Sequence, residues 1–256
     1  MSPSPERGLD LVSTLTRRVL FAPLADHGRA GAVAERLRTA ITLGILAENE
    51  MLPSEADLAA QFNISPVTLR EALVELRTAG LVTTRRGRGG GTVIAGPPPD
   101  QTRESIQQVS SLSSVDLRDL ADWRRTIGAE SARLAARRAS EEDLALLERG
   151  IENLAAASTA VEARRTDSRY FIELAAASQS ARLSRAAIGL QVEYAPILTL
   201  VYTDETTRAS VLAVLRRLTR AVHRGQVEPA GRAAAESIDL VAAKAATLRS
   251  QGWEAT

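Results

Sequence analysis

Three side chains that can hydrogen-bond to nucleic acid begin one predicted helix. Ser65, Thr68 and Arg70 supply two hydroxyls and a guanidinium group within a short stretch. When the start of such a helix enters the major groove of DNA, these groups can reach a phosphate or the edge of a guanine. A surface helix with a solvated arginine would carry the same residues. The elements around them must therefore decide between the two interpretations.

A second group of candidate residues is basic. Arg85, Arg86 and Arg88 stand in a glycine-rich stretch, and no acidic residue occurs in 77–99, although the whole chain has 32 basic and 31 acidic residues. Arginine on a glycine-flanked backbone, as at Arg88 beside Gly89, can enter the narrow, electronegative minor groove. The alternative is a flexible charged loop. A basic tip on a nearly neutral protein nevertheless favours DNA contact.

Three helices and a hairpin would position these side chains. Apolar residues at helical spacing begin after residue 30, and Ser54 is a suitable N-cap for the next helix. Pro66 fits the first position of the third helix, which Gly80 should end. Residues 81–84 and 92–95 read as short strands around the glycine-rich tip. This order predicts a winged helix-turn-helix.

The rest of the chain contains only helix signals. Ser114, Ser140 and Thr166-Asp167 each open a helix, and the last helix runs to about Arg249. The expected fold class is mainly α: an N-terminal winged helix and a C-terminal antiparallel helical bundle large enough to hold a pocket. We divide the chain into an N-terminal arm (1–28), a winged-helix domain (29–95), a linker (96–103) and a helical effector-binding and dimerisation domain (104–252).

Residues 52–59, 64–73 and 76–81 (LPSEADLA, ISPVTLREAL and LRTAGL) resemble the DNA-binding domain of the GntR family of transcription regulators. The resemblance implies that Arg70 contacts operator DNA. At residue 49 the chain has asparagine where the family usually has glycine, and asparagine tolerates the left-handed turn needed there. Ala56 stands where the family often has a DNA-contacting arginine, so one contact should be absent.

Residues 104–250 resemble the FCD effector domain of the FadR-type subgroup, on segments that include RRTI (124–127), DSRYF (167–171) and SQSARL (178–183). Many members hold a divalent metal with one aspartate and three histidines. Asp167 keeps its place here, but Phe171, Leu215 and Ser237 occupy the histidine positions. The resemblance therefore implies neither metal nor cofactor, and leaves Asp167 a role as an N-cap.

Without a metal, the expected effector pocket is apolar and aromatic. Tyr170, Phe171 and Leu215 would line it together with Asp167 and Ser237, and Tyr194 or Tyr202 are further candidates. Arg124 would attract an anionic ligand that has an apolar part. Two alternatives remain open: the tyrosines are ordinary core residues, and Arg124 pairs with an acid on a neighbouring helix. Gly128 occupies a position at which the family usually has a glutamate.

Composition narrows the function further. There is no cysteine, and no uncharged apolar run is long enough for a membrane span, so we expect a cytoplasmic protein without disulfides or membrane contact. We expect a homodimeric transcription regulator, a repressor, that binds operator double-stranded DNA and a small-molecule effector, and that is not an enzyme. The alternatives are a ligand-blind architectural DNA-binding dimer and an enzyme with a DNA-binding appendage.

Overall fold

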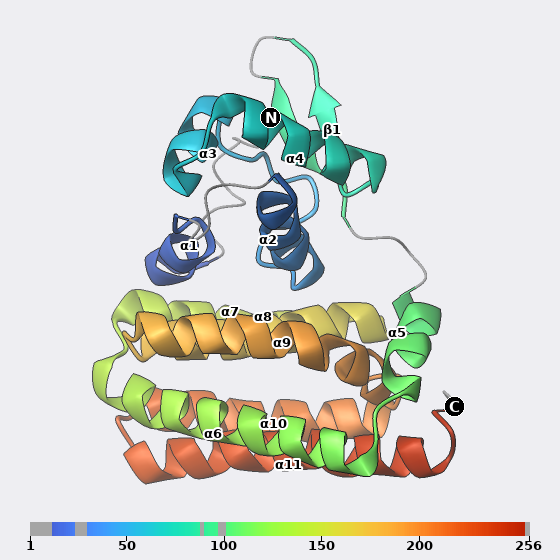
Figure 1. Cartoon of the computed structure of the whole chain (residues 1–256). Helices are drawn as coiled ribbons and strands as arrows, with labels where there is room; N and C mark the ends of the chain where they lie inside the picture. The colour runs from blue at the N-terminus through green and yellow to red at the C-terminus, as the bar shows by residue number, and fades with distance from the viewer. Residues whose placement is uncertain (1–11, 24–29, 88–89, 97–100, 254–256) are drawn as a thin grey trace. The chain divides into compact units, whose positions relative to one another are not determined.

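The computed structural model describes residues 12–23, 30–87, 90–96 and 101–253. The chain divides into two compact units, Met1–Pro99 and Asp100–Thr256. Each unit has its own layered arrangement of elements (Figure 1). The predicted fold class is confirmed, because the first unit carries helices and a two-stranded hairpin and the second carries helices. Among the described residues, no helix is long and apolar enough to cross a membrane.

In the first unit, polar caps fix where the helices begin. Its elements are α1 (Thr14–Leu20), α2 (Ala30–Thr42), α3 (Glu55–Phe62), α4 (Pro66–Thr78), β1 (Val82–Arg85) and β2 (Gly91–Ile94). The Ser54 and Ser65 side chains accept hydrogen bonds from the first turns of α3 and α4. A left-handed Asn63 (φ 55°) turns the chain between these helices. The helix-turn-helix predicted from the sequence is therefore present.

Helix α1 lies within residues 1–28, which the sequence predicted to be a partly ordered N-terminal arm. Ser13 caps it by accepting from the Thr16 backbone, and its apolar side is buried. Phe21, directly after the helix, packs edge-on against Phe62 of α3 with ring centroids 5.7 Å apart. The helix has only seven residues, which is too short to show a clear hydrophobic period. Packing on α3, which is remote in sequence, makes up for its short length.

The hairpin that forms the wing is antiparallel, with Val82 opposite Ile94 and Arg85 opposite Gly91. The loop before α3 extends this small sheet, since the Leu52 backbone N–H donates to Thr92 O at 2.9 Å. That loop starts at Asn49, whose φ of 65° is the left-handed conformation expected where the family has glycine. The asparagine therefore preserves the turn that leads into the DNA-binding elements.

The second unit is a two-layer helical bundle. It contains α5 (Gln101–Ser110), α6 (Ser114–Arg138), α7 (Glu141–Ala156), α8 (Ala160–Ala177), α9 (Ala181–Val201), α10 (Glu205–His223) and α11 (Val227–Ser250). Helices α7, α8 and α9 form one layer and α6, α10 and α11 the other, with α5 at one end (Figure 1). Buried alanine, leucine and aromatic side chains from both layers form one continuous core.

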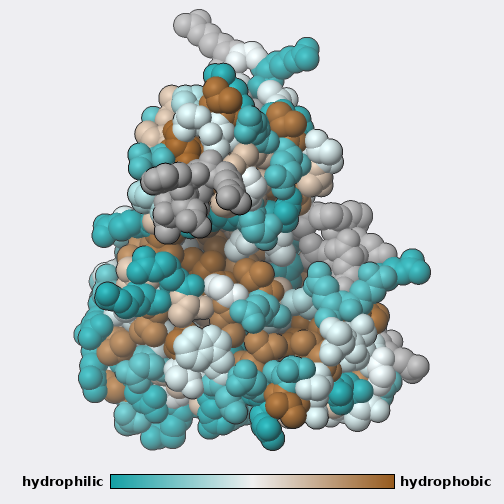
Figure 2. Space-filling view, viewed as in Figure 1, coloured by the Kyte–Doolittle hydropathy of each residue, from teal (hydrophilic) through white to brown (hydrophobic). Residues whose placement is uncertain are grey.

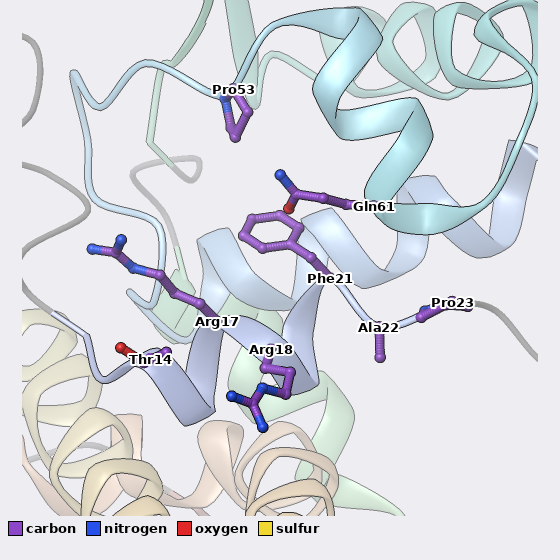
Figure 3. A pocket seen from close by; sticks show the side chains of 8 residues that line it. All are labelled: Thr14, Arg17, Arg18, Phe21, Ala22, Pro23, Pro53 and Gln61. Atoms are coloured by element: carbon purple, nitrogen blue, oxygen red, sulfur yellow. The ribbon is translucent and has the colours of Figure 1, made fainter.

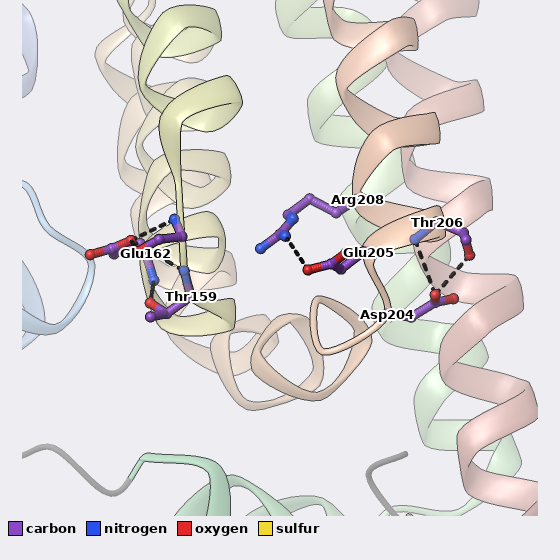
Figure 4. A network of polar contacts seen from close by, with 7 residues as sticks. Thr159, Glu162, Asp204, Glu205, Thr206 and Arg208 are labelled. Carbon is purple, nitrogen blue, oxygen red and sulfur yellow. Dashed lines mark hydrogen bonds and ion pairs between the residues drawn. The ribbon is translucent and has the colours of Figure 1, made fainter.

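One predicted helix start in this unit is wrong. Helix α8 begins at Ala160, where Thr159 and Glu162 form a capping box (Figure 4). Asp167 lies two turns inside the helix and is fully buried, so it is not an N-cap. The error arose because Thr166 and Asp167 look like a start signal, whereas the actual signal is the Thr159–Glu162 pair. Helix α6 is likewise capped by Ser113, one residue before the predicted start.

Candidate DNA interface and ligand core

The outer face of α4 presents the residues predicted to contact DNA. The Arg70 side chain is 65% exposed, and Ser65 and Thr68 lie one turn before it. The two hydroxyls are 2.9 Å apart, and Ser65 Oγ accepts from the Thr68 backbone N–H. The hydroxyls therefore already stabilise the start of the helix. Arg70 has no part in that cap and projects from the following turn.

Glu55, which the sequence reasoning did not select, holds Arg70. The Arg70 Nε donates to Glu55 Oε2 at 2.9 Å, from α4 to the first residue of α3. Because the bond engages Nε, the terminal amino groups keep their donors for phosphate or a base. The sequence offered one signal for this contact, because Glu55 follows the N-cap Ser54 and an acid is favourable in a first turn.

Three other charged residues of this unit, Arg85, Arg86 and Glu75, agree with a DNA-binding face. Arg85 and Arg86 are exposed at the end of β1, where the wing turns. Arg88 and Gly89 lie outside the described residues. Glu75, which would repel phosphate, is turned toward α2 and accepts from Arg38 at 2.8 Å. The acid on α4 that is nearest to α2 is thus neutralised by the protein itself.

A buried ion pair lies in the core of the second unit. Arg124 of α6, only 1% exposed, pairs with Asp167 of α8. Its guanidinium carbon lies 4.8 Å from the ring centroid of Phe171 and 4.6 Å from that of Tyr194. The Tyr202 hydroxyl donates to the other carboxylate oxygen of Asp167 at 2.8 Å. Of the two alternatives for Arg124, pairing with an acid on a neighbouring helix is the one observed.

Burial and mutual charge set the protonation states of this cluster. Burial is the largest single effect on Arg124 and lowers its pKa, but the interactions with Asp167, Tyr194 and Tyr202 together outweigh it, so the pKa is raised and the cation persists. Burial, reinforced by the Asp167 charge, raises the pKa of Tyr202 well above 10.0. Burial also raises the pKa of Tyr194, although the Arg124 cation opposes this. Arg124 is therefore a cation, and the two phenols are neutral.

Several buried polar atoms of the second unit, two of them on Arg124, have no hydrogen-bond partner within the described part of the chain. They are Nε and Nη1 of Arg124, the hydroxyls of Ser131 and Ser168, and Oε1 of Gln191. These residues lie on α6, α8 and α9. Buried polar groups are nearly always paired, so unpaired groups mark places where a water molecule or a ligand can supply the partner.

The remaining predicted pocket residues have structural partners. The Tyr170 hydroxyl is 2.8 Å from Thr219 Oγ1, and its ring packs edge-on against Phe171. Leu215 is fully buried in the main core, and Ser237 Oγ donates to a backbone carbonyl of its own helix at 2.8 Å. The structure therefore brings Arg124, Asp167 and Phe171 together and adds Tyr194 and Tyr202, which the sequence reasoning gave less weight.

The side chains at the family's metal-binding positions do not form a metal site in this chain. The carboxylate of Asp167 is already engaged by a cation and a phenol, and Phe171 and Leu215 have no donor atom. Within the described ranges, no group of three or more histidine, cysteine, aspartate or glutamate side chains could hold a metal ion. His223 is exposed beside Glu148, remote from this core cluster, and His27 lies outside the described residues.

A hollow of about 440 Å³ lies between α1 and α3 in the first unit. Phe21 and Pro53 form its apolar wall, and Arg17 and Arg18 project from α1 at its edge (Figure 3). No sequence pattern indicated helix α1, so this hollow was not predictable from the sequence. The hollow adds apolar surface beside the helix-turn-helix.

Taken together, the exposed helix end, the basic hairpin and the polar cluster in a helical bundle define a DNA-binding protein with a separate ligand domain. The family profile "Bacterial regulatory proteins, gntR family" matches residues 29–92, and the profile "FCD domain" matches residues 119–240. The chain belongs to the GntR family of transcriptional regulators and carries an FCD effector domain.

Named relatives agree with this assignment. The chain is 39% identical over 225 residues to the "Putative HTH-type transcriptional regulator RmpR" of Mycobacterium gastri, covering 86% of this chain and 81% of the relative. It is 34% identical over 126 residues to the "Glc operon transcriptional activator" of Escherichia coli K12, covering 49% of each. It is 28% identical over 149 residues to the "HTH-type transcriptional repressor NanR" of Escherichia coli O1:K1, covering 56% and 55%.

Proposed function

We propose that the chain is a homodimeric regulator that binds operator DNA through α4 and the wing, and that a small molecule beside Arg124 changes its affinity for the operator. The observation that carries the proposal is the exposed start of α4, with Arg70 held by Glu55 next to a hairpin that ends in exposed arginines. Since operator DNA lies in the bacterial cytoplasm, the protein acts there. We propose no enzymatic activity.

The DNA contacts can be tested by gel shift with the full-length protein. Arg70→Ala should weaken operator binding by about 1–3 kcal/mol, because one groove or phosphate contact is lost. Neutralising Arg85 and Arg86 together should flatten the dependence on salt, because fewer counterions are released from DNA. Arg118→Ala, at an exposed position of the second unit, is the matched control and should change neither. An unchanged salt slope in the double variant would remove the wing from the interface.

The ligand proposed for the second unit is apolar and brings a hydrogen-bond acceptor. Arg124 and Asp167 neutralise each other, so a further buried anion would be left without a counter-charge unless it displaced the carboxylate. An uncharged carbonyl or ether oxygen can instead accept from the unpaired Arg124 donors, while an apolar body packs against the aromatic rings. This refines the expectation of an anionic ligand that has an apolar part.

Thermal-shift screening can test this chemistry with matched pairs of an acid and its amide or ester. We expect the neutral member of a pair to raise the melting temperature more than the acid. Absence of any shift across the library, together with intact DNA binding, would favour the ligand-blind architectural dimer instead.

The proposed dimer contact is the face formed by α6 and α9. Trp123 is 49% exposed and Val192 is 38% exposed, next to a small apolar cluster of Ile127 and Leu190 between these helices. Hydrophobic residues gather on this face of the second unit (Figure 2). A two-fold dimer would place two winged helices on a palindromic operator. Trp123→Arg should shift sedimentation toward the monomer, and an unchanged dimer would exclude this face.

The proposed sign of regulation is repression, as in the relative that is named a repressor, although another relative is named an activator. A dimer bound in adjacent major grooves covers DNA that a polymerase would otherwise use. Deletion of the gene should therefore raise transcription from promoters that contain the operator. Reduced transcription would show an activator and would leave the DNA-binding proposal intact.

A further inference from the structure

Two valines on the outer face of α4 are exposed although the protein buries most of its apolar side chains. Val67 is 61% exposed and Val74 is 54% exposed. They flank Arg70 and Glu71, and the four residues line one hollow of about 360 Å³. Single exposed valines need no explanation, but here two share the face that carries the DNA-contacting arginine.

We infer that Val67 reads a thymine of the operator by packing against its C5-methyl group. Helix α4 begins at Pro66, so Val67 is the second residue of the helix, at the end that enters the major groove. The thymine methyl is the one apolar group that a base pair presents in that groove. A valine side chain is stiff about its first torsion, so little conformational freedom is lost when it makes this contact.

The polar groups of the neighbouring residues do not supply this information. Ser65 and Thr68 hydroxyls bond equally well to phosphates and to several bases, and Arg70 favours guanine or phosphate. A methyl contact adds discrimination for A·T at one position of each half-site. The inference rests on the proposed function, because it assumes that α4 enters the major groove.

Val74 provides a matched control on the same helix face. It follows Val67 by two turns, which is about 10.5 Å along the axis at 1.5 Å per residue. Base edges are contacted by the first residues of a recognition helix, so Val74 should lie outside the groove. The two residues have the same side chain and similar exposure, and differ in their distance from the helix start.

The test begins with selection of an operator from a random duplex pool by the full-length protein. Each thymine of the selected duplex is then replaced, one at a time, by deoxyuridine, which lacks only the methyl group. At one thymine per half-site, wild-type affinity should fall about fourfold, which corresponds to about 0.8 kcal/mol for one buried methyl-sized group. Val67→Ala changes both subunits of the proposed dimer, so on the thymine duplex it should lose this factor at each half-site, about sixteenfold in all, and it should lose nothing more when deoxyuridine replaces either thymine. Val74→Ala should bind like the wild type on both.

Two outcomes would overturn the inference: Val67→Ala binding the thymine duplex as tightly as wild type, or the losses from Val67→Ala and from deoxyuridine simply adding. A pool from which no duplex is enriched would contradict the proposed DNA-binding function itself, and the inference with it. If a duplex is enriched but the losses from Val67→Ala and from deoxyuridine add, only the role of Val67 is contradicted. The two failures can thus be told apart.

Discussion

Replacing Asp167 by asparagine should destabilise the helical unit severely. The substitution keeps the size of the side chain but removes the negative charge. Arg124 and the Tyr202 hydroxyl donate to different oxygens of Asp167, so the single amide oxygen of asparagine replaces one acceptor and its NH2 group takes the place of the other. Arg124, 1% exposed, would then be a buried cation with no counter-ion. Breaking a buried pair in this way typically costs about 3–5 kcal/mol. Because an amide oxygen can still accept from Arg124, we expect about 3 kcal/mol.

That loss is a large share of the roughly 5–15 kcal/mol that stabilises an ordinary domain. Urea unfolding followed by tryptophan fluorescence measures it cleanly. The chain has two tryptophans, Trp123 and Trp253, and both belong to the second unit, so the signal reports on that unit alone. Protein concentration must be kept constant, because the proposed dimerisation would make the midpoint depend on concentration.

A charge-free variant is the control. Replacing Arg124 by methionine, Asp167 by leucine and Tyr202 by phenylalanine removes the pair and its hydrogen-bond partner at once. Apolar replacements of buried pairs are often neutral or stabilising, so this triple variant should be much more stable than Asp167→Asn. A loss below about 1 kcal/mol for Asp167→Asn would refute the reasoning, because such a loss is typical of a solvated surface pair.

Three further predictions concern the same core. The folded protein holds the pKa of Tyr202 above its ordinary value, so stability is lost as pH rises above 10, and Tyr202→Phe should show a shallower alkaline loss in denaturation curves measured at several pH values. Gly128→Ala should destabilise the fold although alanine favours helices, because its Cβ would lie 2.8 Å from Ile238 Cδ1; a higher melting temperature would contradict this packing. Elemental analysis of protein purified without a histidine tag should find no stoichiometric transition metal, and a melting temperature that falls on chelation would show that the donor assignment is wrong.

The winged helix could be predicted largely from local signals. Ser54, Ser65 and Pro66 are cap residues whose effect is confined to one turn, so the sequence shows them directly. The left-handed turn at Asn49 was also predictable, because few residue types tolerate that backbone conformation. Helix α1 was not, because its stability depends on the contact between Phe21 and a residue far along the chain.

The cluster around Arg124 and Asp167, by contrast, depends on contacts between helices and could not be predicted from local signals. Residue types showed that the histidines were replaced, but not that Asp167 would be inside a helix and paired with Arg124. That contact joins residues 43 positions apart and depends on how α6 and α8 pack. Tyr194 and Tyr202 reach the same pair from α9 and its C-cap, and no local pattern distinguishes them from ordinary core tyrosines. Tertiary contacts between helices therefore set the chemistry of this site.

The packing around Phe171 indicates a substituted core rather than a damaged metal site. Gly128, where the family usually has glutamate, lets the Phe171 ring approach so closely that an added Cβ would lie 3.2 Å from it. A side chain at residue 128 would crowd the ring and force Ile238 to shift, and the glycine without the ring would leave a cavity. The ring also lies against the Arg124 guanidinium, the cation that now neutralises Asp167. The glycine, the ring and the buried pair therefore depend on one another, and restoring histidine at residue 171 alone would return neither the donor set nor the space for a metal.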